Sequence, residues 1–309
     1  MEKVMVITGP TASGKTGLAV ELALAVNGEI ISADSIQIYR KMNIGTAKPT
    51  MEERRGIPHH LIDIVNPDEE YSVARFKEDA LACIKDIIER GKKPIVVGGT
   101  GLYINSLVYN ITFSETITDW EYREQLNKIS KLEGSHALYE RLKKVDPKSA
   151  ESIHPNNVKR VIRALEVYKT TGIPISEHKE ASRRIPPIYD FLVYGLKMER
   201  KKLYQRIDKR VDMMIDMGLY KEVEELLNSS YSPKLASLQG IGYKEIINAI
   251  VGKCTLDEAI ENIKLGTRHF AKRQITWFNK TEGLNWIEFS DANTWAILKI
   301  LADVLNSRQ

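Results

Sequence analysis

The residues with the clearest chemical meaning stand near the start of the chain, in the stretch GPTASGKT at positions 9–16. It matches the pattern G-x-x-x-x-G-K-[ST], in which backbone N–H groups cradle phosphates, the lysine reaches the terminal phosphates and the hydroxyl ligates Mg²⁺. We therefore predict a diphosphate- or nucleotide-binding loop here, with Mg²⁺ on Thr16. The predicted binding residues are Gly9, Pro10, Thr11, Ala12, Ser13, Gly14, Lys15 and Thr16.

The flanks of this loop have the composition that the motif requires. KVMVI at 3–7 is a short apolar run rich in β-branched residues, which predicts a buried strand. TGLAVELALAV at 16–26 has apolar residues at helical spacing around a single Glu21. A strand, a glycine loop and a helix in this order place a positive helix N-terminus beside the phosphates.

The carboxylate that usually completes a nucleotide-hydrolysing site is missing from its usual place. Such enzymes have a second strand that ends in Asp, which holds Mg²⁺. The best later strand, at 94–98, is followed by Gly99 and Thr100 instead. A carboxylate appears earlier, where Asp34 follows a predicted strand at 29–33. The sequence therefore favours phosphate binding without ordinary hydrolysis.

Strand and helix patterns alternate over the first part of the chain. Strands are predicted at 3–8, 29–33, 60–65 and 94–98, and Ser72 is placed to cap a helix that ends near Gly91. This alternation predicts an α/β fold with a parallel sheet covered by helices. Ligands bind such sheets at the carboxyl ends of the strands. Because Lys15, Asp34 and Thr100 all follow strand ends, we expect them to converge on one crevice.

The strand signal vanishes between residues 113 and 187, where three stretches have helical patterns, and a strand returns at 188–198. The remaining residues are mostly helical. We predict a discontinuous catalytic core, formed by 1–112 and 188–309, with a helical insertion domain at 113–187.

Two basic stretches could bind RNA. KLGTRHFAKRQITWFNK at 264–280 has no acidic residue and interleaves aromatic residues with cations. Phosphates attract cations, and splayed bases stack on aromatic rings, but a solvated helix face with core aromatics fits equally well. The cations concerned are Lys264, Arg268, Lys272 and Arg273, together with Lys159, Arg160 and Arg163 of a second stretch.

Arg206 and Arg210 stand four residues apart and share one helix face. One of them could clamp the charge on a phosphate group. Pairing with Asp208 or Asp212 is the structural alternative, and the sequence does not separate the two.

Bulk composition sets wide limits. Of 309 residues, 43% are hydrophobic and 28% are charged, which is ordinary for a globular protein. No apolar run approaches the roughly 18 residues of a membrane span. Because the first predicted strand begins within a few residues of Met1, we expect no signal peptide. Cys83 and Cys254 lack metal-ligand spacing, so a reducing cytosol is expected. The neighbouring His59 and His60 are expected to be a surface pair, since adjacent strand residues face opposite ways.

Eight motifs occur in order over about positions 4–280. They are GPTASGKT, ISADSIQIYR, IGTAKP, VGGTGLY, HPNNVKRVIRALEV, RIDKRVDMM, GIGYKE and TRHFAKRQITWF. Together they resemble the tRNA dimethylallyltransferase (isopentenyl-tRNA transferase) family. The resemblance implies transfer of a five-carbon prenyl group from dimethylallyl diphosphate to the exocyclic N6 amine of the tRNA adenosine 3′ of the anticodon. The phosphates would then be the leaving group.

The resemblance also implies roles for individual residues. Asp34 would be the general base, Thr100 would lie near the bridging oxygen of the diphosphate, and Lys15 and Arg210 would stabilise the departing diphosphate with Mg²⁺. The helical insertion would grip the anticodon stem-loop. The implied tRNA contacts are Asp34, Ser35, Ile36, Gln37, Thr100, Arg123, Lys159, Arg160 and Arg163. From the basic stretch at 264–280, we add Arg268, Lys272 and Arg273 as predicted tRNA contacts. We expect a cytoplasmic monomer that needs no protein partner and no membrane.

Two rival functions remain open from the residues alone. A small-molecule kinase that moves phosphate from ATP fits the phosphate loop and sheet equally well. A non-catalytic RNA-binding protein switched by nucleotide fits the basic stretches.

Overall fold

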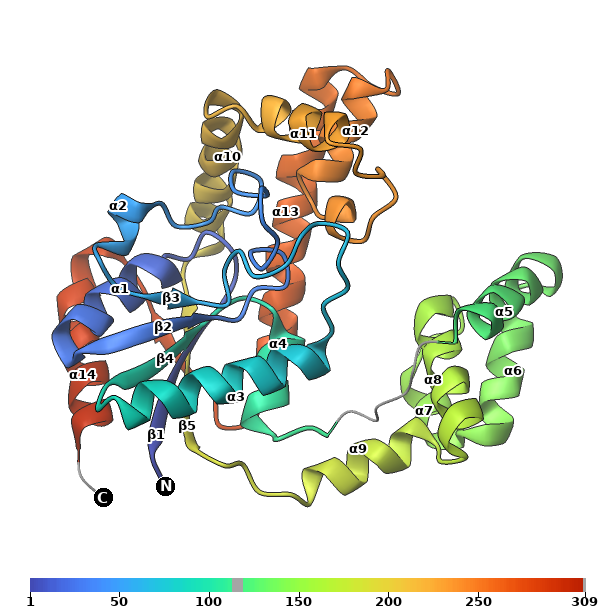
Figure 1. The fold of residues 1–309 in the computed structure, drawn as a ribbon, viewed down its shortest axis with the longest axis horizontal. Coiled ribbons are helices and arrows are strands. Elements are labelled where there is room, and N and C mark those ends of the chain that lie inside the picture. The colour runs from blue at the N-terminus through green and yellow to red at the C-terminus, as the bar shows by residue number, and fades with distance from the viewer. Residues whose placement is uncertain (113–118, 308–309) are drawn as a thin grey trace. The chain divides into compact units, whose positions relative to one another are not determined.

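The computed structural model describes residues 1–112 and 119–307 (Figure 1). The chain divides into a core unit, Met1–Leu107 with Ile188–Gln309, and a helical unit, Val108–Pro187. The predicted start of the helical insertion, residue 113, falls in the stretch 113–118, which lies outside the described residues. Each unit is described by itself below.

The described part of the core unit holds one six-stranded sheet in the order β3-β2-β4-β1-β5-β6. Every neighbouring pair is parallel. The predicted α/β class is therefore confirmed, and the carboxyl ends of all strands meet at one edge. The strands are β1 (Lys3–Thr8), β2 (Gly28–Ser32), β3 (His59–His60), β4 (Lys93–Val97), β5 (Asp190–Lys197) and β6 (Asn285–Glu288).

Two strand predictions need correction. The strand predicted at 60–65 is only the two residues of β3, because Leu61 and Asp63 adopt positive φ angles of 60° and 58°, which extended backbone does not permit. The prediction that 199–309 is mostly helical missed β6. It is a four-residue edge strand that is half-buried at most, so its apolar signal is weak.

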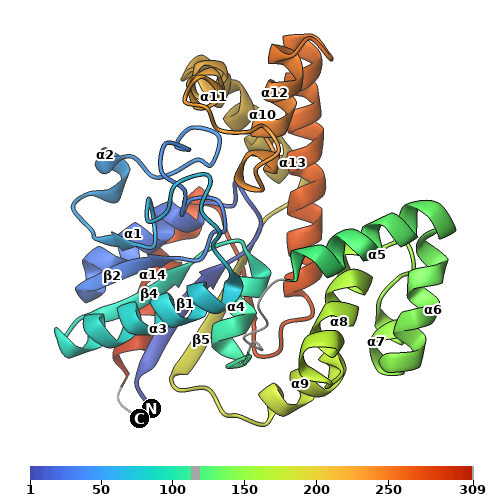
Figure 2. The ribbon, with the colours of Figure 1, turned by 45° about the vertical axis from the view of Figure 1, so that its right-hand side comes forward.

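Helices cover both faces of the sheet. On one face, α1 (Lys15–Val26) and α14 (Thr294–Asn306) bury leucines such as Leu22 and Leu301 against β1 and β4. On the other face lies α3 (Val73–Glu89), which Figures 1 and 2 show running across the strands. The predicted cap is confirmed, since the Ser72 hydroxyl accepts a hydrogen bond from the Arg75 backbone N–H at 3.2 Å. The short helices are α2 (Met51–Arg54) and α4 (Gly101–Val108).

A second helical layer of the core unit follows β5. Its long helices α10 and α13 lie side by side, as both ribbon views show. A cluster that includes the buried side chains of Val211, Leu219 and Tyr243 joins this layer. The helices are α10 (Arg200–Asp216), α11 (Leu219–Asn228), α12 (Tyr243–Ile250) and α13 (Leu256–Phe278), with short 3₁₀ turns at Ser237–Gln239 and Asp291–Asn293.

The helical unit packs its helices around buried residues such as Leu126, Leu142 and Leu165. The helices predicted from the sequence are present, and two shorter ones, α7 and α9, join them. The five are α5 (Trp120–Glu133), α6 (Ser135–Val145), α7 (Pro147–Ser152), α8 (Val158–Thr171) and α9 (Ile175–Arg183). Among all described residues, no helix is both long and apolar enough to cross a membrane.

Candidate active site

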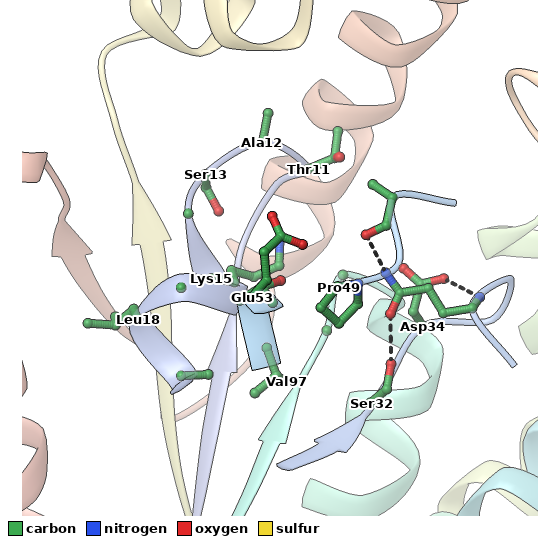
Figure 3. A pocket seen from close by; sticks show the side chains of 18 of the residues that line it. Thr11, Ala12, Ser13, Lys15, Leu18, Ser32, Asp34, Pro49, Glu53 and Val97 are labelled. Atoms are coloured by element: carbon green, nitrogen blue, oxygen red, sulfur yellow. Dashed lines mark hydrogen bonds between the residues drawn. The ribbon is translucent and has the colours of Figure 1, made fainter. Parts of the chain in front are cut away.

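A pocket of about 500 Å³ opens at the carboxyl ends of the strands in the core unit. Figure 3 shows Lys15 near the loop of Thr11, Ala12 and Ser13, with Asp34 just after the end of β2. In the sheet, β4 lies between β2 and the strand that precedes this loop, β1. The predicted convergence of Lys15 and Asp34 is therefore present in the structure. The lining includes residues 11–16, Asp34, Gln37, Gly98, Gly99, Arg206, Arg210, Phe270 and Gln274.

The shape of the phosphate loop depends on two glycines. Gly9 has a φ of 135°, and a Cβ there would meet the Leu196 carbonyl oxygen at 2.5 Å. Gly14 has a φ of 91° and directly precedes α1. With Ala12 also at positive φ, the loop curls into a concave row of backbone N–H groups at a helix N-terminus. This geometry binds anions.

Lys15 lies within this loop, where its Nζ donates a hydrogen bond to the Pro10 carbonyl at 2.6 Å. Burial, and then the charge of Arg210, lower the pKa of Lys15 from 10.5 to about 7, while Asp34 opposes the shift. Burial is the larger cause of this lowered pKa, and the contribution of Arg210 shows that two cations face the same pocket.

Arg206 and Arg210 both line the pocket, on α10. Burial and the neighbouring Arg206 lower the pKa of Arg210, while Glu53 opposes the shift. The two acidic residues considered as their partners pair with cations of α13: Asp208 with Arg268 at 3.3 Å and Asp212 with Lys264 at 2.9 Å.

Asp34 forms the other side of the pocket. Its Oδ1 accepts backbone N–H bonds from Ile36 at 2.9 Å and Gln37 at 3.3 Å. Within the described residues, Oδ2 accepts no hydrogen bond, so it is the oxygen available to a substrate donor. Ser35 and Ile36 do not line the pocket, whereas Gln37 does.

Thr100 lies beside Asp34 rather than on the pocket wall. Its hydroxyl accepts a hydrogen bond from the Ser35 backbone N–H at 3.0 Å. Its own backbone N–H donates to the Ala33 carbonyl at 3.2 Å. Thr100 therefore ties the end of β4 to the turn that carries Asp34.

One wall loop is held by residues that the sequence analysis missed. Glu222 accepts backbone N–H bonds from Asn43 and Ile44 at 2.8 Å each and from Gly45 at 3.1 Å. The Tyr243 hydroxyl donates to the same carboxylate at 2.7 Å. This clamp fixes the loop that continues into the pocket-lining residues 46, 47 and 49.

The side chains of the basic stretch on α13 differ in their partners and in their exposure. Arg268 pairs with Asp208, while Lys272 and Arg273 are exposed. Of its aromatics, Phe270 and Trp277 keep 36% and 38% of their surface, whereas Phe278 is fully buried. A solvated helix face and a core aromatic are therefore both present, and RNA binding by the exposed cations stays a prediction.

The cations predicted to contact tRNA in the helical unit fall into two pairs. Arg123 and Arg163 both donate to the fully buried Glu166, at 2.8 and 2.6 Å. Lys159 and Arg160 are exposed in the first turn of α8. All four belong to the helical unit, and the pocket of the core unit is built without them.

The expectation that His59 and His60 form a surface pair is wrong, since both are half-buried and His59 lines the pocket. The Nδ1 of His59 lies 2.8 Å from the Ile57 carbonyl, and the Nε2 of His60 lies 2.7 Å from the Glu29 carboxylate. Within the described residues, no group of three His, Cys, Asp or Glu side chains could hold a metal ion.

The pocket nevertheless fits Mg²⁺ bound together with a diphosphate. Mg²⁺ keeps several waters and takes few protein ligands when phosphates supply the rest. Thr16 lines the pocket at the start of α1 and is exposed to it. The nearby Ser13 Oγ is buried and has no hydrogen-bond partner within the described residues, so the loop keeps an unused polar group.

Comparisons with known proteins agree with this geometry. The chain matches the family model described as IPP transferase over residues 37–281, and that described as Isopentenyl transferase over 2–71. It is 58% identical to a tRNA dimethylallyltransferase of Acetivibrio thermocellus over 287 residues, 93% of this chain and 92% of that relative. It is 52% identical to one of Pelotomaculum thermopropionicum over 290 residues, 94% of this chain and 92% of that relative.

Solved structures are similar over nearly the whole chain. A tRNA isopentenylpyrophosphate transferase of Bacillus halodurans has a TM-score of 0.74 at 43% identity, over 99% of this chain and 97% of that one. A eukaryotic dimethylallyltransferase acting on tRNA has a TM-score of 0.85 at 33% identity, over 100% of this chain and 81% of that one. The chain therefore belongs to the IPP transferase family, the tRNA dimethylallyltransferases.

Proposed function

We propose that this chain transfers a dimethylallyl group from dimethylallyl diphosphate to N6 of the tRNA adenosine immediately 3′ of the anticodon, and releases diphosphate. The observation that carries the proposal is the pairing, in one pocket, of a cationic phosphate loop with a carboxylate. Lys15, Arg206 and Arg210 suit the diphosphate, and the Asp34 Oδ2 suits an N–H donor.

The bond changes balance without any further reactant. The electron pair of N6 forms the new bond to C1 of the donor, while the C1–O bond breaks and its electrons pass to the diphosphate. The N6 proton passes to the Asp34 Oδ2. An adenine amine is a weak nucleophile because its lone pair is delocalised into the ring, so a positioned base assists the attack.

The departing diphosphate gains negative charge, which the loop N–H groups, Lys15 and Arg210 stabilise. Mg²⁺ held by Thr16 and phosphate oxygens would neutralise part of the same charge. The target base must leave the anticodon-loop stack to reach the pocket.

Contacts to the tRNA are proposed for the exposed cations Lys159, Arg160, Lys272 and Arg273, and for Gln37 at the pocket. Arg123, Arg163 and Arg268 have acidic partners, so they would contact the RNA with these pairs intact. We propose that the chain acts in the cytoplasm as a monomer, without an obligate protein partner.

The rivals have less support. A kinase would transfer a phosphoryl group to its acceptor, whereas a prenyltransferase releases diphosphate as the leaving group. None of the relatives reported above is named a kinase. A binding-only protein would have no use for a carboxylate in the same pocket as the phosphate loop.

The test is the intact mass of an anticodon stem-loop RNA after incubation with the protein, Mg²⁺ and dimethylallyl diphosphate. We expect a gain of one C₅H₈ unit, which disappears when the target adenosine is replaced by guanosine. Release of ADP from ATP that depends on a small-molecule acceptor would identify a kinase instead. Bound but unaltered RNA would identify a binding protein.

The metal role of Thr16 has its own test. Thr16→Ala removes the hydroxyl from the mouth of the pocket, and we expect the Mg²⁺ concentration for half-maximal activity to rise about tenfold. Thr16→Ser keeps the hydroxyl and serves as the matched control. Identical Mg²⁺ titrations for wild type and Thr16→Ala would remove Thr16 from the metal site.

A further inference from the structure

Gln274 is a polar side chain on the buried face of α13. It is 6% exposed and lies between Ala271 and Phe278, both fully buried. Buried amides are kept where their hydrogen bonds are satisfied, so the partners of Gln274 indicate its purpose.

Both ends of the amide group have a partner. Oε1 accepts the backbone N–H of Thr11 at 2.8 Å, and Nε2 donates to the carbonyl of Gly99 at 2.9 Å. These partners fix the orientation of the amide, because only this orientation sets an acceptor against a donor at each end. A Cβ on Gly99 would collide with the same amide, so the backbone there approaches Gln274 as closely as glycine allows.

The two partners belong to different halves of the pocket. Thr11 lies in the loop after β1 that continues to Lys15. Gly99 lies after β4 and precedes Thr100, whose hydroxyl holds the turn that carries Asp34. One side chain of a third element therefore joins the diphosphate half to the carboxylate half.

We propose that Gln274 is a positioning residue that fixes the phosphate loop relative to the Asp34–Thr100 turn, so that the donor carbon and the acceptor amine meet in line. This inference rests on the proposed function, since it assigns the two halves to the two substrates. Misplacement of reacting groups by about 1 Å can cost about 10² in rate, even when the altered residue is remote from the chemistry.

The test uses Gln274→Met, which keeps the length of the side chain but makes neither hydrogen bond. We expect kcat to fall about 10- to 10²-fold, with the Kd of inorganic diphosphate and the Kd of the stem-loop RNA each within about threefold of wild type. Each half would still bind its own ligand, and only the alignment between them would be lost.

The matched control is Ser237→Ala. Ser237 is 1% exposed and donates to the Pro67 carbonyl at 2.6 Å, in the core unit but outside the pocket. Its loss should lower Tm while leaving kcat within about twofold. If Gln274→Met keeps wild-type kcat, or if Ser237→Ala loses as much activity as Gln274→Met, the positioning role is wrong.

Gln274→Glu adds a readout that a purely structural role would not move. The ionised carboxylate of this variant would still accept from Thr11 but would set an oxygen against the Gly99 carbonyl, whereas the protonated carboxyl would donate there. We expect its rate deficit relative to wild type to shrink as pH falls from about 9 to about 6. The same deficit at every pH would contradict a role for the Gly99 bond. Absence of prenyl transfer by the wild type would instead refute the proposed function.

Discussion

Asp34→Asn is expected to lower kcat for prenyl transfer by about 10² to 10⁴, the usual contribution of a positioned general base. The reason is that the two carboxylate oxygens of Asp34 have different functions. Oδ1 accepts the N–H groups of Ile36 and Gln37, and an asparagine oxygen can replace it there. An amide in place of Oδ2 cannot take the proton from N6.

Asp34→Ala separates catalysis from local structure. It loses the base and also the anchor of the turn, so we expect a larger fall in kcat and, in addition, a lower Tm. Single-turnover rates with saturating donor and RNA, together with RNA affinity, distinguish the two variants. Asp34→Asn should bind the stem-loop within about threefold of wild type. A wild-type rate in Asp34→Asn would mean that the proton leaves by another route.

The sequence was sufficient for features that short patterns and topology determine. The loop at 9–16 is recognisable because strand, glycines and helix are contiguous. Asp34 could be placed beside Lys15 because the ends of parallel strands meet at one edge of the sheet. The family resemblance and the α/β class are confirmed by the comparisons and by the sheet order. The catalytic and tRNA-binding roles stay predictions.

Features that depend on distant partners were not predictable in this way. The sequence of the basic stretch gave no indication of a role for Gln274. Its spacing from Ala271 and Phe278 nevertheless places all three residues on the buried face of the helix. Its partners, Thr11 and Gly99, are 263 and 175 residues away in the chain. Likewise, the partners of Asp208 and Asp212 were not predictable from α10 alone. Both pair with cations of α13, Arg268 and Lys264.

Lys15→Met is expected to lower kcat by about 10² to 10³. This is the usual loss when one hydrogen-bond donor to the charge that develops in the transition state, here on the departing diphosphate, is removed. Lys15 has a lowered pKa of about 7, because burial and Arg210 disfavour its charged form. A diphosphate bound at the loop reverses this balance, since a nearby anion favours the charged form. Binding of the donor should therefore restore the proton to Lys15.

The pH dependence follows from this change of pKa. Below about pH 7 the empty pocket already holds protonated Lys15, so donor binding takes up no proton there. Above it, the empty pocket loses the proton and the complex keeps it. Donor affinity should therefore fall by up to about tenfold per pH unit as pH rises above about 7.

Calorimetric titration of dimethylallyl diphosphate at about pH 8, in two buffers with different ionisation enthalpies, measures the proton uptake directly. The terminal phosphate of the donor has a pKa of about 6, so at about pH 8 it contributes little to the proton uptake. We expect an uptake close to one proton for wild type and close to none for Lys15→Met. Lys15→Arg keeps a fixed charge, so it should bind with little pH dependence while positioning the diphosphate less well. Equal proton uptake in wild type and Lys15→Met would assign the titrating group elsewhere in the pocket and leave Lys15 charged throughout.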